Sequence, residues 1–438
     1  MKNDVSRRLI DFLDGSPTCY QAIENLSSRL REKGYAPLRE SERWSLERGG
    51  KYFTTRGESS LIAFRLPAGE LRGFMLTASH SDSPTFKLRQ NAEVPSAGST
   101  VRLSVEGYGG AIMRSWLDKP LSVAGRVFVK KGAGLASKLI DIDRDLLVIP
   151  SLAIHMNREM NKGVELKANV DMLPLFSMQG EEGAFRRLVA EAAGVGADDV
   201  VSTELFLYPR TPGTLVGLNG EFIVSPRLDD LECVFCCYTA FVVSERAPSA
   251  SAPLFCVFNN EEVGSGSRQG ANSTFLEDTV GRICGALDMS ADERGAAVAD
   301  SFMISADNAH AIHPAHSEYA DGNEFPVLNG GVVIKYNAAQ KYTTDGLSGA
   351  VFSRLCELAG VPVQRYSNRA DLPVVSTLGN ISGSHLSVPT VDIGLPQLAM
   401  HSCYEIAGVK DAEYLIEAVR AFYGKSFRHG ADGRIALE

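Results

Sequence analysis

The sequence predicts an α/β protein with a central sheet covered by helices, interrupted by an inserted β-rich domain. Several short runs are apolar on both faces, which is typical of strands covered by helices on both sides of a sheet. Residues 100–210 show a shorter, alternating pattern that indicates hairpins instead. The chain has 438 residues, whereas a single core stops growing near ~250–300 residues. Two domains are therefore expected.

The N-terminal region is predicted to form a helix that begins after Ser16. Ser16 is a suitable N-cap, and Pro17 suits the first helical position because its missing N–H costs nothing there. Apolar residues follow at helical spacing, at Cys19, Ile23, Leu26 and Leu30, before a natural stop at Gly34. Near the other end, a second helix is predicted from one apolar face made by Leu415, Ile416, Val419 and Phe422.

The buried strands are expected between these two helices. The apolar runs that predict them are residues 60–64, 74–77, 254–258, 302–305, 331–334 and 391–393. The alternating segments 101–105 and 121–130 predict strands of the inserted unit, and residues 184–193 predict one helix within it. We therefore expect a discontinuous domain made of residues 1–93 and 216–438, and an inserted domain made of residues 94–215.

Composition and charge exclude several classes of function. There are 44 Lys and Arg against 53 Asp and Glu, so the net charge is 44 − 53 = −9. Nucleic-acid and anionic-membrane proteins depend on basic patches, so neither class of partner is expected. No run approaches the ~20 apolar residues of a membrane span. The start lacks the apolar run of a signal peptide, and the eight cysteines stand mostly among apolar neighbours. These features predict a cytoplasmic protein.

Side chains able to bind metals stand just after the predicted strands. His80 and Asp82 follow one strand, Glu261 and Glu262 another, Asp307 and His310 a third, and His401 follows the last; Asp229 lies in a further polar patch. Open α/β sheets bind ligands at the carboxyl ends of their strands. Histidine and carboxylate ligands together suit Zn, Mn or Co. One carboxylate of the Glu pair can ligate a metal while the other takes a proton from water, and Asp229 can lie between two metals.

Each of these residues also has a simpler explanation. His80 can be a hydrogen-bonded core or surface residue, and the Glu261–Glu262 pair can be a solvated helix start. Asp229 can be an N-cap or turn residue. His310, His313 and His316 can mark one helix face. Only the coincidence of several polar clusters with strand ends favours a metal site.

Five ordered motifs resemble those of the aspartyl aminopeptidase family, which are co-catalytic dinuclear zinc exopeptidases. The motifs are HSDSP at 80–84, SPRLD at 225–229, NEEVGS at 260–265, SAD at 305–307 with AHAIHP at 309–314, and PQLAMHS at 396–402. The inserted segments at 115–126 and 152–158 match the same family pattern. The resemblance implies a zinc-exopeptidase fold with a central mixed sheet and an inserted dimerisation domain.

The resemblance also implies the metal ligands. His80, Asp229 and Asp307 are expected to hold one divalent metal ion. Glu262, His401 and again Asp229 are expected to hold a second, so Asp229 would bridge the two ions. Zinc is the expected metal, with Mn or Co as alternatives. In the wider clan a cis peptide follows the bridging carboxylate, which predicts one at Asp229–Asp230.

Further roles follow from the same resemblance. Glu261 is expected to be the general base, and Asp82 the acid that orients His80. His310 is expected to contact the substrate or its developing oxyanion, and Lys335 a substrate carboxylate. His155 is expected to reach the active site of a partner subunit, although without the family it would be taken for a residue packed within its own subunit.

The implied function is removal of N-terminal residues, Asp or Glu, from peptides with a free N-terminus. A water activated by the two metals would attack the first peptide carbonyl, with Glu261 as the base. Dimers are expected to assemble into a closed tetrahedral dodecamer. The alternatives are a two-metal dipeptidase or deacylase on the same fold, and a non-catalytic metal-binding scaffold.

Overall fold

The computed structural model describes residues 2–180, 182–245, 249–372 and 376–438. It contains a nine-stranded sheet in the order β1-β2-β3-β13-β4-β14-β18-β16-β17. These strands are β1 (Ala36–Leu38), β2 (Lys51–Arg56), β3 (Ser60–Arg65), β4 (Gly73–His80), β13 (Ser251–Phe258), β14 (Phe302–Ala306), β16 (Val332–Tyr336), β17 (Val363–Ser367) and β18 (Thr390–Gly394). All six strands predicted for the central sheet are therefore confirmed.

The sheet is mixed. Strands β13, β4, β14 and β18 run parallel to one another, whereas β3 is antiparallel to β13, and β16 is antiparallel to β18. The carboxyl ends of the four parallel strands therefore meet at one edge, where ligands bind in folds of this kind.

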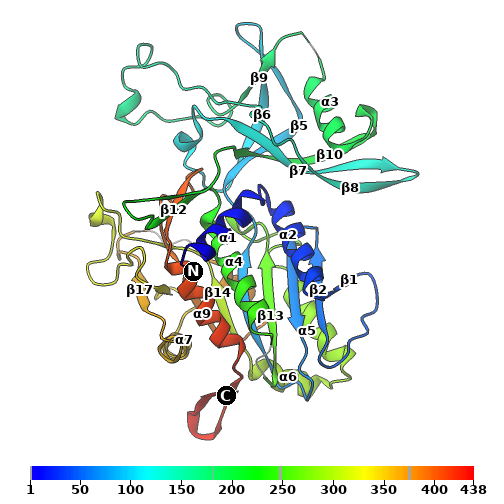
Figure 1. Cartoon of the computed structure of the whole chain (residues 1–438), viewed down its shortest axis with the longest axis vertical. Coiled ribbons are helices and arrows are strands. Elements are labelled where there is room, and N and C mark those ends of the chain that lie inside the picture. The colour runs from blue at the N-terminus through cyan, green and yellow to red at the C-terminus, as the bar shows by residue number, and fades with distance from the viewer. Residues whose placement is uncertain (1, 181, 246–248, 373–375) are drawn as a thin grey trace.

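Helices cover both faces of this sheet (Figure 1). One face packs against α1 (Lys2–Asp14), α2 (Cys19–Glu32), α4 (Leu228–Val243), α7 (Gly346–Ala359) and α9 (Asp411–Tyr423). The other packs against α5 (Phe275–Ala286), α6 (Ala291–Ala299) and α8 (Leu378–Ser382). Strand β13 shows why its sequence is apolar throughout: Phe255 belongs to the first core and Leu254 to the second. No helix in the described part of the chain is long and apolar enough to cross a membrane.

The helix predicted near the C-terminus is confirmed as α9, but the predicted start of the N-terminal helix was wrong by two residues. The N-cap of α2 is Thr18, not Ser16. The backbone of Thr18 is extended (φ −141°, ψ 169°), and its side chain accepts a hydrogen bond from the Tyr20 N–H. Ser16 instead lies in the turn after α1, where its N–H bonds the carbonyl of Leu13.

The inserted unit has a six-stranded antiparallel sheet in the order β8-β7-β10-β5-β6-β9, which lies above the nine-stranded sheet in Figure 1. Its strands are β5 (Thr85–Ser96), β6 (Thr100–Tyr108), β7 (Leu121–Lys131), β8 (Gly134–Asp141), β9 (Leu175–Met178) and β10 (Val200–Pro209), and α3 (Ala184–Ala193) packs beside them. Trp116, in a 3₁₀ turn at Met113–Trp116, packs edge-on against Phe86 with the ring centres 5.3 Å apart. The predicted strands and helix of this unit are thus present.

The sheets divide the chain slightly differently from the predicted boundaries. Strand β5 already belongs to the inserted sheet, so the boundary expected between residues 93 and 94 falls inside it. At the other end, β11 (Thr214–Val216) pairs with β12 (Phe222–Ser225) in a five-stranded sheet that also contains β15 (Ala309–His310), β19 (Pro396–Leu398) and β20 (Glu405–Gly408). A short hairpin of β21 (Phe427–His429) and β22 (Ile435–Leu437) ends the chain.

Candidate metal centre

The five predicted metal ligands come from five different elements and meet at the carboxyl edge of the large sheet. His80 is the last residue of β4, and Asp307 directly follows β14. Glu262 lies in a 3₁₀ turn after β13, Asp229 in the first turn of α4, and His401 in the loop between β19 and β20. The topology thus brings together residues that are more than 300 positions apart in the sequence.

Asp229 lies at the centre of this cluster and turns one oxygen toward each histidine. Its Oδ1 is 3.4 Å from His80 Nε2, and its Oδ2 is 3.5 Å from His401 Nε2. A second carboxylate accompanies each histidine: Asp307 Oδ1 is 3.9 Å from His80 Nε2, and Glu262 Oε2 is 3.4 Å from His401 Nε2. The geometry therefore contains two groups, each of one histidine and one carboxylate, that share Asp229.

The donor set fits divalent cations of the zinc type. Donor atoms of His80, Asp229 and Glu262 all lie within 4.8 Å of one another. Two buried carboxylate oxygens, Asp229 Oδ1 and Glu262 Oε1, accept no hydrogen bond from the described residues. Buried carboxylates are costly unless they are paired or coordinate a metal. Oxygen and imidazole donors with unused lone pairs are what a zinc site requires.

The ionisation of the cluster follows from its burial and its charges. Burial alone would raise the pKa of Asp229, but the nearby imidazole groups of His401 and His80 outweigh it and hold that pKa below its usual value. Burial would lower the pKa of His80, yet its carboxylate neighbours, Asp229 first, hold it well above the usual value. Cation binding must displace such a proton from Nε2, so metal affinity here depends on pH.

Asp82 links the cluster to Glu261. Its carboxylate accepts the backbone N–H groups of Glu261 and Glu262, each at 3.2 Å. His80 Nδ1 lies 3.0 Å from the Asp82 carbonyl and 3.5 Å from its carboxylate. Both neighbours of Nδ1 are acceptors, so Nδ1 carries a proton in the neutral ring, and the lone pair of Nε2 is available to a metal. Burial, supported by the charges of Asp307, Asp82 and Asp229, raises the pKa of Glu261 to about 8 although His80 opposes it.

The three residues predicted to contact substrate lie in different settings. Lys335 is 2% exposed; its Nζ donates to the Asn308 carbonyl at 3.0 Å and is 3.7 Å from Asp307 Oδ2. His310, in β15, reaches the surface but has its pKa lowered by burial and by the charge of Lys335. His155 is exposed in a loop of the inserted unit, so it is not packed within its own subunit.

Sequence reasoning missed three residues that hold this site. Glu405 accepts the backbone N–H of Asp229 at 3.0 Å and that of His401 at 2.7 Å, so one buried carboxylate fixes both. Asp230 Oδ2 accepts the His80 N–H at 3.1 Å, and the Asp229–Asp230 peptide is cis, as predicted. The third residue is Tyr108. Proximity to the motifs is the only sequence signal for Glu405 and Asp230.

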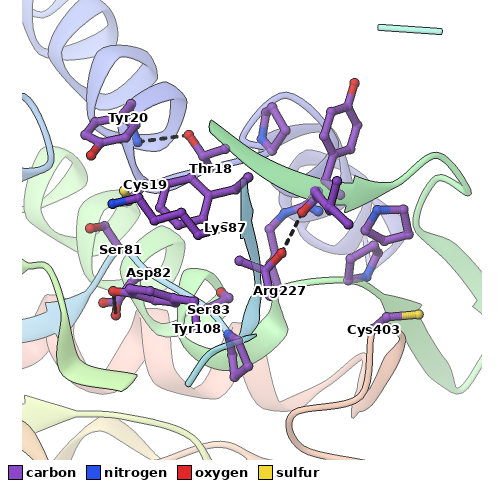
Figure 2. A pocket seen from close by; sticks show the side chains of 18 of the residues that line it. Thr18, Cys19, Tyr20, Ser81, Asp82, Ser83, Lys87, Tyr108, Arg227 and Cys403 are labelled. Atoms are coloured by element: carbon purple, nitrogen blue, oxygen red, sulfur yellow. Dashed lines mark hydrogen bonds between the residues drawn. The ribbon is translucent and has the colours of Figure 1, made fainter. Parts of the chain in front are cut away.

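Tyr108 comes from the inserted unit. Its hydroxyl donates to Asp82 Oδ2 at 2.7 Å and accepts from Asn260 Nδ2 at 2.8 Å. Figure 2 shows Tyr108 beside Asp82 on one wall of a cavity of about 100 Å³, which Cys19 and Arg227 also line. Thr18 at the start of α2 and Glu405 also line this cavity.

Comparison with known proteins agrees with this geometry. The model of the aminopeptidase I zinc metalloprotease (M18) family matches residues 12–423. A probable M18 family aminopeptidase 2 from Clostridium acetobutylicum is 42% identical over 433 residues, which cover 97% of this chain and 100% of that protein. These matches confirm the resemblance found in the motifs.

Solved structures share the fold. A chain in the cryo-EM structure of the Ape4 and Nbr1 complex aligns with a TM-score of 0.93 and 34% identity, covering 97% of this chain and 86% of that chain. The S. cerevisiae mApe1 dodecamer aligns with a TM-score of 0.84 and 27% identity, covering 96% of both chains. The predicted mixed α/β fold is thereby confirmed.

Proposed function

Because the chain belongs to the aminopeptidase I zinc metalloprotease (M18) family, we propose that it removes an N-terminal Asp or Glu from peptides with the help of two zinc ions. Family membership makes it a metal-dependent aminopeptidase, a hydrolase of peptide bonds. The acidic specificity, the number of ions and the role of each residue form the proposal.

One observation carries the two-ion proposal. The two oxygens of Asp229 face two different histidines, and each histidine has a further carboxylate beside it. A site for a single ion would need only one of these groups. His80 and Asp307 would therefore hold one ion, and Glu262 and His401 the other, with Asp229 between them.

The bound ions would polarise the peptide carbonyl and make a shared water acidic enough to ionise near neutral pH. Glu261 accepts a proton from the attacking water and returns it to the leaving amine. Asp82 keeps Glu261 in place through its backbone N–H and keeps the His80 ring in the required tautomer. His310 lies in β15, three residues after the proposed ligand Asp307, and we infer that it contacts the substrate carbonyl.

Lys335 supports the acidic specificity. It is a buried ammonium within 4 Å of a proposed metal ligand, and its Nζ lies 5.4 Å from the centre of the Tyr342 ring. An ammonium group carries three donors, and the structure gives Lys335 one hydrogen bond, to the Asn308 carbonyl, and one nearby carboxylate, Asp307. We infer that a substrate carboxylate shares Lys335 with Asp307.

The assembly and location are proposed on the same basis. We infer that the inserted unit, proposed at residues 94–215 and supported by the separate six-stranded sheet, forms a dimer contact and delivers His155 to the site of a neighbouring subunit. The exposure of His155 supports this role. Dimers would join into a dodecamer like that of S. cerevisiae mApe1. All eight cysteines are free and buried, which supports a reducing, cytoplasmic setting.

The test is a panel of peptides that differ only in the N-terminal residue, assayed with and without a chelator. Release of Asp and Glu in preference to Ala and Leu, abolished by the chelator and restored by zinc, is expected. Preferential cleavage of dipeptides or of N-acylated amino acids would favour a dipeptidase or a deacylase. Zinc binding without release of any residue would favour a scaffold.

A further inference from the structure

One segment of the inserted unit, residues 108–119, lies against the loop that carries His401. We call this segment the strap. The Gly110 carbonyl oxygen is 3.2 Å from His401 Nδ1, and the Ile112 N–H donates to the His401 carbonyl at 2.9 Å. Farther along, Ser115 Oγ accepts the N–H of Cys403 at 2.9 Å. The strap therefore contacts both the ring and the backbone of His401.

Two further contacts join the strap to the loop that carries His401. The Cys403 thiol donates to the Ser115 carbonyl at 2.9 Å, and Lys119 Nζ is 3.2 Å from Cys403 Sγ. At its other end, the strap reaches Asp82 through Tyr108. Cys403 itself packs into the core of the inserted unit rather than into either core of the large sheet. The loop around His401 is thus held by the inserted unit.

His401 needs such support more than the other proposed ligands. Its side chain is 31% exposed, whereas that of His80 is 1% exposed. Its backbone has φ +67°, a left-handed conformation that is uncommon for a residue with a side chain. A residue in such a conformation persists only where its surroundings fix it. Glu405 accepts the hydrogen bond of the His401 N–H, whereas the strap donates to the His401 carbonyl and lies beside its ring.

The glycines of the strap allow this close approach. A Cβ on Gly110 would lie 3.3 Å from His401 Nδ1, and one on Gly109 would lie 3.0 Å from Glu262 Cβ. A Cβ on Gly107, three residues earlier, would meet no atom within 4 Å. The backbone therefore passes closest to the metal cluster at the two glycines that face Glu262 and His401, the proposed ligands of the second ion.

We propose that the strap is the positioning element of the second metal site. The Gly110 carbonyl accepts the Nδ1 proton of His401 and so presents Nε2 to the metal. Partners of this kind typically change metal affinity ~10–100-fold. This inference rests on the proposed two-ion function and adds that the inserted unit, within the same subunit, sets the affinity for one of the two ions. By linkage, zinc at that site must in turn stabilise the contacts between the strap and the His401 loop.

The test compares Gly110→Ala with the matched control Gly107→Ala. Metal-free protein is titrated with zinc against a chromophoric chelator, which resolves the binding steps without measuring activity. We expect Gly107→Ala to match the wild type. In Gly110→Ala the zinc affinity of one binding step should fall ~10–100-fold, while that of the other step is unchanged. Ser115→Ala, which removes the partner of the Cys403 N–H without adding bulk, should weaken the same step and serves if Gly110→Ala does not fold.

The outcomes separate the two proposals. Two zinc ions per wild-type subunit, with unchanged steps in Gly110→Ala and Ser115→Ala, would overturn the role of the strap but not the two-ion site. A single zinc ion per wild-type subunit would overturn the two-ion proposal. The positioning role of the strap would then be supported only if Gly110→Ala lowered the zinc affinity of that one site. Hydrogen exchange is an independent readout, since zinc should slow exchange in peptides that contain Ile112 and Cys403. Unchanged exchange there would contradict the linkage.

Discussion

Replacing Lys335 with Met separates two roles that the structure gives to one ammonium group. Lys335 Nζ is 3.7 Å from Asp307 Oδ2, so it can orient a proposed metal ligand. It is also the residue proposed to bind the acidic side chain of the substrate. Methionine keeps most of the length and removes the charge. The two roles differ in what this change does to substrates with and without a carboxylate.

The expected magnitude follows from the distance. Two unit charges 3.7 Å apart interact by about 4 kcal/mol at an effective dielectric constant of ~20. This energy corresponds to about 10³-fold in an equilibrium constant. If a substrate carboxylate lies at a similar distance from Nζ, kcat/KM for an N-terminal Asp should fall by about 10³-fold in Lys335→Met relative to that for an N-terminal Ala.

The assay measures kcat/KM with aspartyl and alanyl p-nitroanilides, and zinc per subunit on the same samples. Lys341→Met, at an exposed position on the following loop, is the matched control and should change neither value. Equal losses for both substrates with normal zinc would refute the proposed recognition of the acidic side chain. Equal losses together with lost zinc would show that Lys335 acts through Asp307 alone.

Three further predictions test the remaining roles. Glu261→Gln should keep normal zinc and lower kcat roughly 10²–10⁴-fold, because the amide cannot accept a proton; an unchanged kcat would move the base elsewhere. Asp229→Asn leaves only one of the two proposed coordinating oxygens. Taking ~3 kcal/mol per ligand, at least one zinc-binding step should weaken by about 10²-fold. Zinc titration curves like those of the wild type would contradict the proposal that Asp229 bridges the two ions. Mixed His155→Ala and Glu261→Gln subunits should regain activity above either parent after proven subunit exchange, whereas no recovery would place His155 in its own subunit.

Much of the catalytic domain was predictable because its signals are local. The strands at the centre of the sheet are mostly apolar because they are buried on both faces: neighbouring residues such as Leu254 and Phe255 enter different cores. Four of the proposed ligands were recognisable because they end a strand or stand shortly after one, at one edge of the sheet: His80, Glu262, Asp307 and His401. The motifs then linked these residues to a family, which supplied roles that spacing alone left open.

What the sequence did not reveal depends on contacts between distant segments. The hydrogen bond that the Gly110 carbonyl accepts from His401 joins residues 291 positions apart, and a backbone carbonyl has no sequence signature. Tyr108 reads as one more residue of an alternating strand, yet its hydroxyl bonds Asp82. The start of α2 was misplaced because Ser16 and Thr18 are both good N-caps, and only the turn after α1 decides between them.

The packing of Trp116 gives the molecule a native optical reporter. The chain has two tryptophans. Trp116 belongs to the strap and is 2% exposed against Phe86, whereas Trp44 lies in the catalytic domain with the Arg282 guanidinium 3.9 Å from its ring centre. Trp44→Phe would leave Trp116 as the single tryptophan, within the strap and next to Ser115, which bonds the Cys403 N–H. The fluorescence emission of the Trp116 indole would then report how the inserted unit packs against the rest of the subunit, in solution and without a label.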